Sequence, residues 1–200
     1  MPDSFGYWRL AVNLLQHGVF SQGVEGTLYP DAVRTPVYPL FILIVKELFF
    51  GFYGVIIIQE IISALVAVLT AHLTMLIFAN ATASIMAGLL VSANFASILF
   101  ASTLLTCTLF TFLLLLSITC LFLSIKTGKH YYILFAGVLA GLMVLCRPVG
   151  ALLPLLMGCM FAFMSMKQGF GLRLTSYRLP ITKWAIWFTA ISYIIVLPWV

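Results

Sequence analysis

"LTMLIFANATASIMAGLLVSANFASILFASTLLTCTLFTFLLLLSITCLFLSI" (residues 73–125) decides the fold class, because it contains no charged side chain. A helix of about 20 apolar residues crosses the hydrocarbon core of a bilayer, so this stretch is long enough for two spans. It lacks the alternation of a barrel strand, and helices are the other structure that satisfies the backbone inside a bilayer. The sequence therefore predicts an all-α, polytopic integral membrane protein.

The rest of the chain has the same character on both sides of this stretch. Of its 200 residues, 64% are hydrophobic and 8% are charged, whereas a soluble domain carries roughly 25% charged residues. Pro148 interrupts the apolar sequence near residue 150 and ends any helix there. We expect about six transmembrane helices, at residues 52–78, 83–100, 104–124, 131–146, 149–166 and 184–200.

The first 51 residues are more polar and contain two shorter helical segments. Residues 4–17 carry apolar side chains on one face and polar ones on the other, which is typical of a helix lying in the membrane interface. Residues 36–51 are apolar but include Lys46 and Glu47, and we expect an interfacial or re-entrant helix there. The predicted domains are an outer loop with interfacial helices (1–51) and a transmembrane helical domain (52–200).

The distribution of charge predicts the topology. Basic residues without any acid fill the segments 126–130 and 167–183, which the positive-inside rule places in the cytoplasm. All five acids then lie on or toward the outer side, and the net charge of +5 needs no nucleic acid to explain it. The basic residues are Lys126, Lys129, Lys167, Arg173, Arg178 and Lys183; the acids are Asp3, Glu25, Asp31, Glu47 and Glu60.

This topology places the first 51 residues on the outer side of the membrane. Nothing in the sequence before residue 52 has the apolar run that export needs, so we expect that a preceding transmembrane helix is missing and that the chain is a fragment of a larger protein. The four cysteines lie within apolar runs and have no CxxC spacing, which indicates neither a disulfide framework nor a zinc site.

Three segments that could carry chemistry meet at the predicted outer face: the segment around Asp3, residues 34–41 and the turn 146–150. A carboxylate can deprotonate an attacking hydroxyl, and arginines such as Arg34 and Arg147 can stabilise a departing phosphate. Each residue also has a simpler interpretation. Asp3 suits a helix N-cap, Arg34 a headgroup anchor and Arg147 a side chain that snorkels to the interface.

Three stretches in this order resemble the GT-C class of membrane glycosyltransferases, which includes protein mannosyltransferases and the lipid A aminoarabinose transferase. They are "PDSFGYWRLAVNLLQHGVFS" (2–21), "RTPVYPLFILIVKELFFG" (34–51) and "VLAGLMVLCRPVGALLPLL" (138–156). The resemblance implies an inverting hexosyl or pentosyl transferase of the bacterial inner membrane. Such an enzyme moves a sugar from a polyprenyl-phosphate donor to a lipid, glycan or protein acceptor, with its active site on the periplasmic side.

The resemblance also implies roles for particular residues. Asp3 matches the family's acid in D-S-x-x-Y and would activate the acceptor, while Tyr7, Arg34 and Arg147 would bind substrate. Basic residues or a divalent metal ion would assist the departing phosphate. Family members carry a second acid where this chain has Cys107, and a thiol is a poor ligand for a hard cation. We therefore expect an incomplete or inactive fragment.

A transporter or channel-like membrane subunit is the alternative. Glu60, His72 and Arg147 would then line a pathway through the membrane. The expected spans 83–100 and 104–124 count against this alternative, because their polar residues are limited to Ser, Thr and Asn.

Overall fold

The computed structural model describes residues 2–24, 28–31, 33–48, 51–166 and 181–199, and within these ranges the chain is helical without any strand. The helices are α1 (Pro2–His17), α2 (Val37–Leu48), α3 (Phe52–Phe78), α4 (Ala81–Ser92), α5 (Phe95–Ala101), α6 (Thr106–Thr127), α7 (Tyr131–Cys146), α8 (Leu153–Met166) and α9 (Ile181–Val196). Two short 3-10 turns, η1 (Pro148–Gly150) and η2 (Leu197–Trp199), follow α7 and α9. The predicted all-α class is confirmed.

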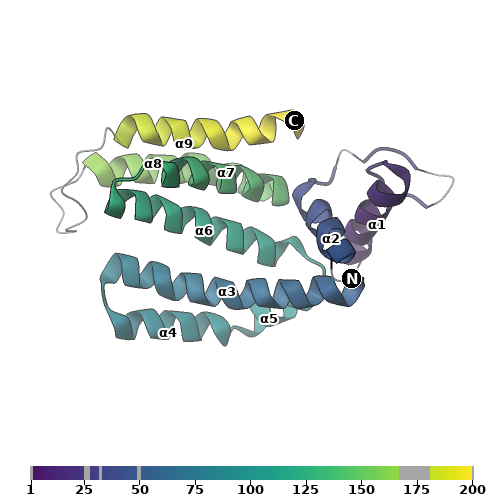
Figure 1. Cartoon of the computed structure of the whole chain (residues 1–200), viewed down its shortest axis with the longest axis horizontal. Helices are drawn as coiled ribbons and strands as arrows, with labels where there is room; N and C mark the ends of the chain where they lie inside the picture. Colours follow the sequence, from purple (N-terminus) through teal and green to yellow (C-terminus); the bar gives the residue numbers. More distant parts are fainter. Residues whose placement is uncertain (1, 25–27, 32, 49–50, 167–180, 200) are drawn as a thin grey trace.

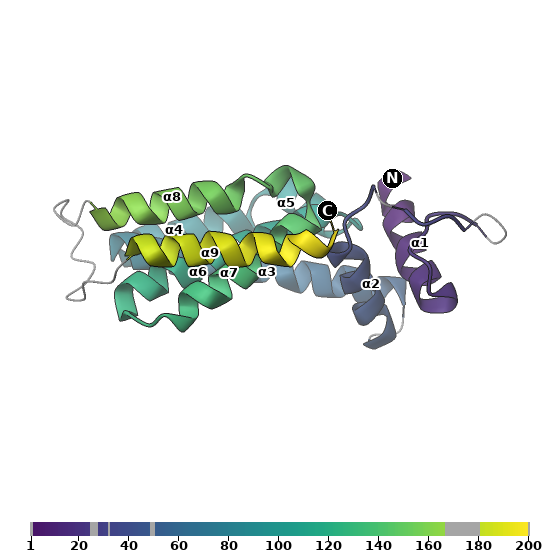
Figure 2. The same cartoon turned by 90° about the horizontal axis from the view of Figure 1, so that it is seen from above.

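The long helices lie side by side, and α1 and α2 cross one end of them (Figures 1 and 2). We call this the α1–α2 end. The α3–α4 and α6–α7 turns lie at the opposite end, which we call the far end (Figure 1). The two helices predicted for the first 51 residues therefore exist, and both sit where the helices of the bundle terminate.

Two helices are long and apolar enough to cross a membrane, α3 and α6. Their 27 and 22 residues correspond to about 40 and 33 Å, against a hydrocarbon core of about 30 Å. A third span is present if the bent pair α4 and α5 counts as one. Because α7, α8 and α9 have only 16, 14 and 16 residues, the described structure does not confirm the expected six spans.

The expected span at 83–100 is bent, because α4 and α5 meet at an angle of 55°. The break falls at Asn94, whose side-chain oxygen accepts hydrogen bonds from the backbone N–H groups of Ala96 and Ser97. An asparagine that satisfies the first free N–H groups of a helix is a strong start signal. Here it begins a new helix in the middle of an apolar run.

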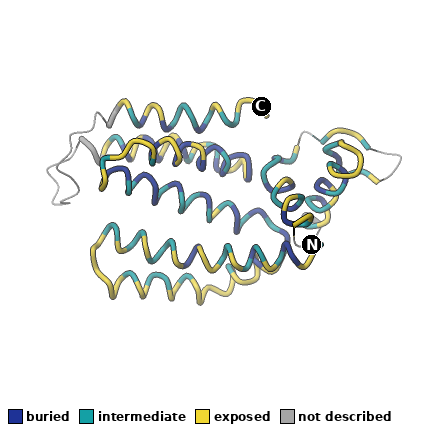
Figure 3. The backbone as a smooth tube through the Cα atoms, in the orientation of Figure 1, coloured by how far each residue is buried: buried dark blue, intermediate teal, exposed yellow. Residues whose placement is uncertain are grey.

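Burial is uneven across the bundle (Figure 3). Helix α7 lies at its centre, and Ile133, Ala136, Ala140 and Met143 have no exposed surface. In contrast, α4 has no buried residue at all, although it carries no charged side chain and its only polar side chains are Thr82, Ser84 and Ser92. A helix that is apolar on every side is typical of a membrane span or of the core of a large protein.

Two glycines set the distance between α7 and α9. A Cβ on Gly137 would lie 3.1 Å from the carbonyl oxygen of Phe188, and one on Gly141 would lie 2.8 Å from that of Ser192. The G-x-x-x-G spacing therefore permits the close approach of two helix backbones, as it does in membrane helix pairs.

Helix α1 begins earlier than residue 4, the start expected from the sequence. Its first residue is Pro2, so Asp3 lies in the first turn and not at an N-cap position. The interpretation of Asp3 as an N-cap is therefore wrong, because its backbone is already helical. The helix ends at His17, and Gly18 follows with a left-handed φ of 67°, the conformation that favours glycine after a helix.

Candidate functional site

One buried hydrogen bond joins the segment before α2 to the end of α7. The Thr35 hydroxyl donates to the Cys146 carbonyl oxygen at 3.1 Å. Arg34 directly precedes Thr35, and Arg147 directly follows Cys146. The structure thus brings together the two segments that carry the predicted phosphate-binding arginines, although they are far apart in the sequence.

Tyr7 contacts the first of these arginines. The guanidinium carbon of Arg34 lies 4.6 Å from the centroid of the Tyr7 ring, within the range of a cation–π interaction. The Tyr7 ring in turn packs edge-on against Tyr38, with 4.9 Å between the centroids. The predicted substrate-binding residues Tyr7 of α1 and Arg34, just before α2, therefore form one cluster with Tyr38 of α2.

The second arginine, Arg147, lies beside Cys107 at the start of α6. Arg147 is exposed, and its Nη1 donates to the sulfur of Cys107 at 3.1 Å. Cys107 is the second residue of α6, where free backbone N–H groups and the helix dipole favour a negative charge. The start of α6 thus completes a region that α1, α2 and α7 also border.

The backbone of Asp3 belongs to the first turn of α1, and its side chain lies outside the described residues. The adjacent residues Ser4 and Phe5 line a pocket of about 360 Å³. Helix α3 and the α5–α6 linker provide the rest of its wall, which is mostly apolar with a few hydroxyl groups. The lining is completed by Trp8, Phe52, Ile56, Ser102, Thr103 and Leu104.

Asp31 is an acid of this region for which the sequence predicted no role. The Gln22 side-chain amide donates to one of its carboxylate oxygens, and the Val33 N–H donates to the other at 2.8 Å. Burial raises the pKa of Asp31, but the hydrogen bonds from Gln22, Val33 and Arg34 and the charge of Arg34 outweigh it, so the pKa lies below the usual value. The sequence signal was Pro30-Asp31, since an aspartate that bonds the N–H two residues later is typical of a turn.

Gln59 is the second residue that the sequence did not single out. It lies inside α3 with no exposed surface. Its side-chain oxygen accepts from the Tyr38 hydroxyl at 3.2 Å, and its nitrogen donates to the Leu105 carbonyl at 3.2 Å. Burial is also the main cause that raises the pKa of Tyr38, so its hydroxyl keeps its proton. A lone amide in an apolar helix was the available signal, because such side chains bond across helices.

The described residues at this end do not fit a divalent metal ion. Hard cations need several oxygen ligands, and no group of three or more His, Cys, Asp or Glu side chains lies close enough together in the described ranges. Both carboxylate oxygens of Asp31 already accept a hydrogen bond, one from the Gln22 side chain and one from the Val33 N–H. The sulfur of Cys107 accepts a hydrogen bond from Arg147. We therefore derive no step through a metal.

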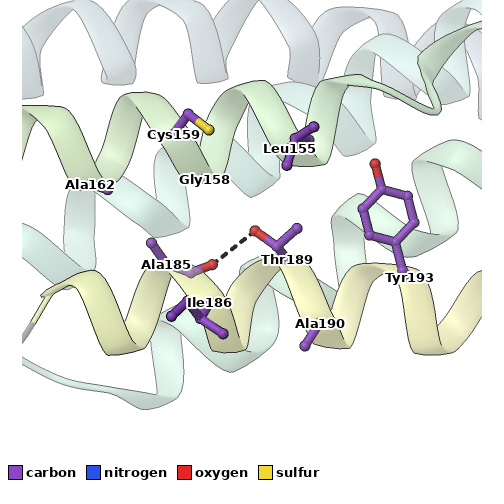
Figure 4. A pocket seen from close by; sticks show the side chains of 9 residues that line it. All are labelled: Leu155, Gly158, Cys159, Ala162, Ala185, Ile186, Thr189, Ala190 and Tyr193. Carbon is purple, nitrogen blue, oxygen red and sulfur yellow. Dashed lines mark hydrogen bonds between the residues drawn. The ribbon is translucent and has the colours of Figure 1, made fainter.

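A larger cavity, of about 510 Å³, lies between α8 and α9 (Figure 4). Its wall is apolar, and its hydroxyl groups are already bonded. Thr189 donates to the Ala185 carbonyl at 2.8 Å, and Tyr193 donates to the Ala151 carbonyl at 2.7 Å. The remaining side chain with a polar or reactive atom in its lining is the free thiol of Cys159. The Tyr193 bond fixes α9 to the chain just after η1, four residues from Arg147 in the sequence.

The residues of the transport alternative are spread over the bundle. Glu60 is half-buried and His72 is exposed on α3, whereas Arg147 is exposed at the α1–α2 end. No protein-family model, curated protein or solved structure matches this chain. The functional argument therefore rests on the residues and contacts described above.

Proposed function

We propose that this chain is an integral membrane glycosyltransferase of the GT-C type, with the α1–α2 end on the periplasmic side of the bacterial inner membrane. The observation that carries the proposal is the Thr35–Cys146 hydrogen bond, because it holds the segments of Arg34 and Arg147 together. Two guanidinium groups at the end of the bundle that also holds a mostly apolar pocket bordered by α1 suit a phosphate-linked lipid substrate.

The surface of the bundle supports the membrane part of this proposal. Large apolar side chains of α3 and α4 are exposed, for example Val68 (62%), Ile85 (61%) and Leu90 (69%). Extended apolar surfaces of this kind mark contact with a membrane or with another protein. The short helices α7, α8 and α9 can serve as further spans where the bilayer thins locally or flanking residues snorkel.

In the proposed reaction, Arg34 and Arg147 bind the phosphate of a polyprenyl-phosphate sugar. The carboxylate of Asp3 accepts the proton of an acceptor hydroxyl, whose oxygen attacks the anomeric carbon of the sugar. A bond forms between this carbon and the acceptor oxygen, and the bond to the phosphate oxygen breaks. The phosphate leaves with the electron pair, stabilised by the arginines, and attack from the opposite side inverts the configuration.

Asp3→Asn tests the role of the acid. The protein, reconstituted in vesicles of a total lipid extract, is incubated with a radiolabelled polyprenyl-phosphate sugar, and labelled lipid or released sugar is measured. We expect Asp3→Asn to lower transfer at least a hundredfold without weakening binding of the donor, because general-base catalysis contributes 10²–10⁴-fold. Arg9→Gln, an exposed substitution on the same helix, is the control.

The outcomes separate the parts of the proposal. Donor binding without transfer by the unchanged protein supports the expectation of an inactive form. Transfer that survives in Asp3→Asn at the unchanged rate contradicts the catalytic assignment, and the absence of both binding and transfer contradicts the function.

We prefer transfer over transport because of where His72 lies. A transport pathway would place this residue inside the bundle, whereas it is exposed on the surface of α3.

A further inference from the structure

At the far end of the bundle, two rings join segments that are distant in sequence. The His130 ring, just before α7, stacks on the Trp184 ring of α9, with 4.3 Å between the centroids and 10° between the planes. A stack this close and parallel fixes the α6–α7 turn against the first turns of α9. The residues next to each ring are therefore held near one another.

A lysine directly precedes each of the two stacked residues. Lys129 precedes His130, and its Nζ lies 5.9 Å from the centroid of the Tyr131 ring. Lys183 precedes Trp184 and is exposed. Lys126, also exposed, lies in the last turn of α6 directly before the same turn. We call Lys126, Lys129 and Lys183 the far-end lysines.

The protein itself offers these lysines no acid from the helices around them. The sequence contains no Asp or Glu after Glu60, so α4 to α9 carry no carboxylate side chain. The described acids are Asp31 and Glu47 at the α1–α2 end, where Glu47 pairs with Lys46 at 3.6 Å, and Glu60, which lies nearer the start of α3 than its far end at Phe78. The positive charge of the far end is therefore complementary to an anion from outside the chain.

The aromatic residues among the lysines indicate what kind of anion this is. Tyr131 is 54% exposed and Trp184 is half-buried, and both lie at the ends of apolar helices. Tyrosine and tryptophan at such positions are typical of the boundary between hydrocarbon and headgroups. Lysines at this boundary lie at the depth of lipid phosphates and attract anionic lipids.

We propose that the far-end lysines, together with Tyr131 and Trp184, form a binding site for anionic phospholipid headgroups. The His130–Trp184 stack holds the site together by joining the α6–α7 turn to α9. This proposal rests on the membrane placement proposed above and not on transferase activity, because the site lies at the opposite end from Arg34 and Arg147. The bound lipid stabilises the packing of α9 against the rest of the bundle.

Lipid binding by the full-length chain tests this site. The protein in detergent is titrated with phosphatidylglycerol or phosphatidylcholine, and bound lipid is counted by native mass spectrometry. We expect phosphatidylglycerol to bind preferentially and the double variant Lys129→Gln/Lys183→Gln to lose about tenfold to thirtyfold in affinity, since one lysine near an anionic surface contributes on the order of fivefold. Lys129→Arg/Lys183→Arg should restore binding.

Lys46→Gln is the matched control. Its Nζ also lies 5.9 Å from an aromatic centroid, that of Trp8, but at the α1–α2 end and beside Glu47. We expect it to leave phosphatidylglycerol binding unchanged.

Three results would overturn the proposal. The first is equal binding of the two lipids, and the second is undiminished phosphatidylglycerol binding by the glutamine double variant. The third is full competition by millimolar inorganic phosphate, which would identify a site for soluble phosphate. Polyprenyl-phosphate binding should persist in the double variant, so a failure of the transferase proposal remains distinguishable from a failure of this one.

Discussion

The contact between Arg147 and Cys107 places a cation next to a neutral side chain at the start of α6. The thiol sulfur accepts from Nη1 at 3.1 Å, and the backbone N–H groups of the first helical turn point to the same region. A carboxylate at position 107 would meet both the guanidinium and the positive end of the helix dipole. Position 107 is therefore one at which the structure favours an acid.

Cys107→Glu should therefore stabilise the protein. Because Arg147 is exposed, solvent screens the new ion pair, and we expect a gain of only about 0.3–1 kcal/mol in the free energy of unfolding. Thermal unfolding in detergent measures this gain. In the Arg147→Gln background, the gain should shrink by at least half, and an equal gain in both backgrounds would show that the arginine does not contact position 107.

Single residues of the site differ in how far the sequence could predict them. Arg34 and Arg147 were identified from topology and from a family resemblance, and the structure places their segments together. The sequence did not single out Gln59 and Asp31, because their roles depend on the groups to which they are hydrogen-bonded in the folded chain. The groups that Gln59 bonds, Tyr38 and Leu105, lie more than a helix away in the sequence, and no periodic pattern predicts such contacts.

Helix α3 is joined to two other segments through Gln59. This side chain bonds Tyr38 of α2 and the carbonyls of Thr103 and Leu105 in the α5–α6 linker. It therefore connects the segment that bears Arg34 to the segment that leads into Cys107. Together with the Thr35–Cys146 hydrogen bond, this amide holds segments of the candidate site in place.

Gln59→Leu should destabilise the protein by about 1–3 kcal/mol, because it leaves the buried Tyr38 hydroxyl and the linker carbonyls without their partner. Thermal unfolding in detergent measures the loss. Gln16→Leu, at an exposed position of α1, makes the same chemical change and should have little effect. Equal effects of the two substitutions would argue against the proposed role of Gln59.

Apolar runs in the sequence predicted where helices occur, but they did not predict where a helix is interrupted. The expected helices near 4–17, 52–78 and 131–146 all occur. The run at 83–100 reads as one span because its composition is uniformly apolar, yet the side chain of Asn94 caps a second helix inside it. A capping residue has a local effect that an average over many residues conceals.

At the scale of the whole molecule, the acids are confined to the first 60 residues of the chain, whereas basic residues occur at both ends of the bundle. Lys126, Lys129 and Lys183 flank the α6–α7 turn and the start of α9, where the helices α4 to α9 carry no acid. The acids Asp31 and Glu47 belong to the segments of the α1–α2 end, which also carries Arg34, Lys46 and Arg147. The sequence could predict the two ends but not the number of spans. Helices of 14 to 16 residues are near the lower limit of a bilayer, and a bent pair counts as one span or as none.

The affinity of the full-length chain for a polyprenyl phosphate tests the central claim most directly. We expect Arg34→Gln and Arg147→Gln each to weaken binding about tenfold to a hundredfold, because a hydrogen bond to a charged group is worth about 1.5–3 kcal/mol. Arg9→Gln, an exposed substitution on α1, should leave the affinity unchanged. If the first two variants bind as tightly as the unchanged protein, the two arginines do not form a phosphate site and the account is wrong.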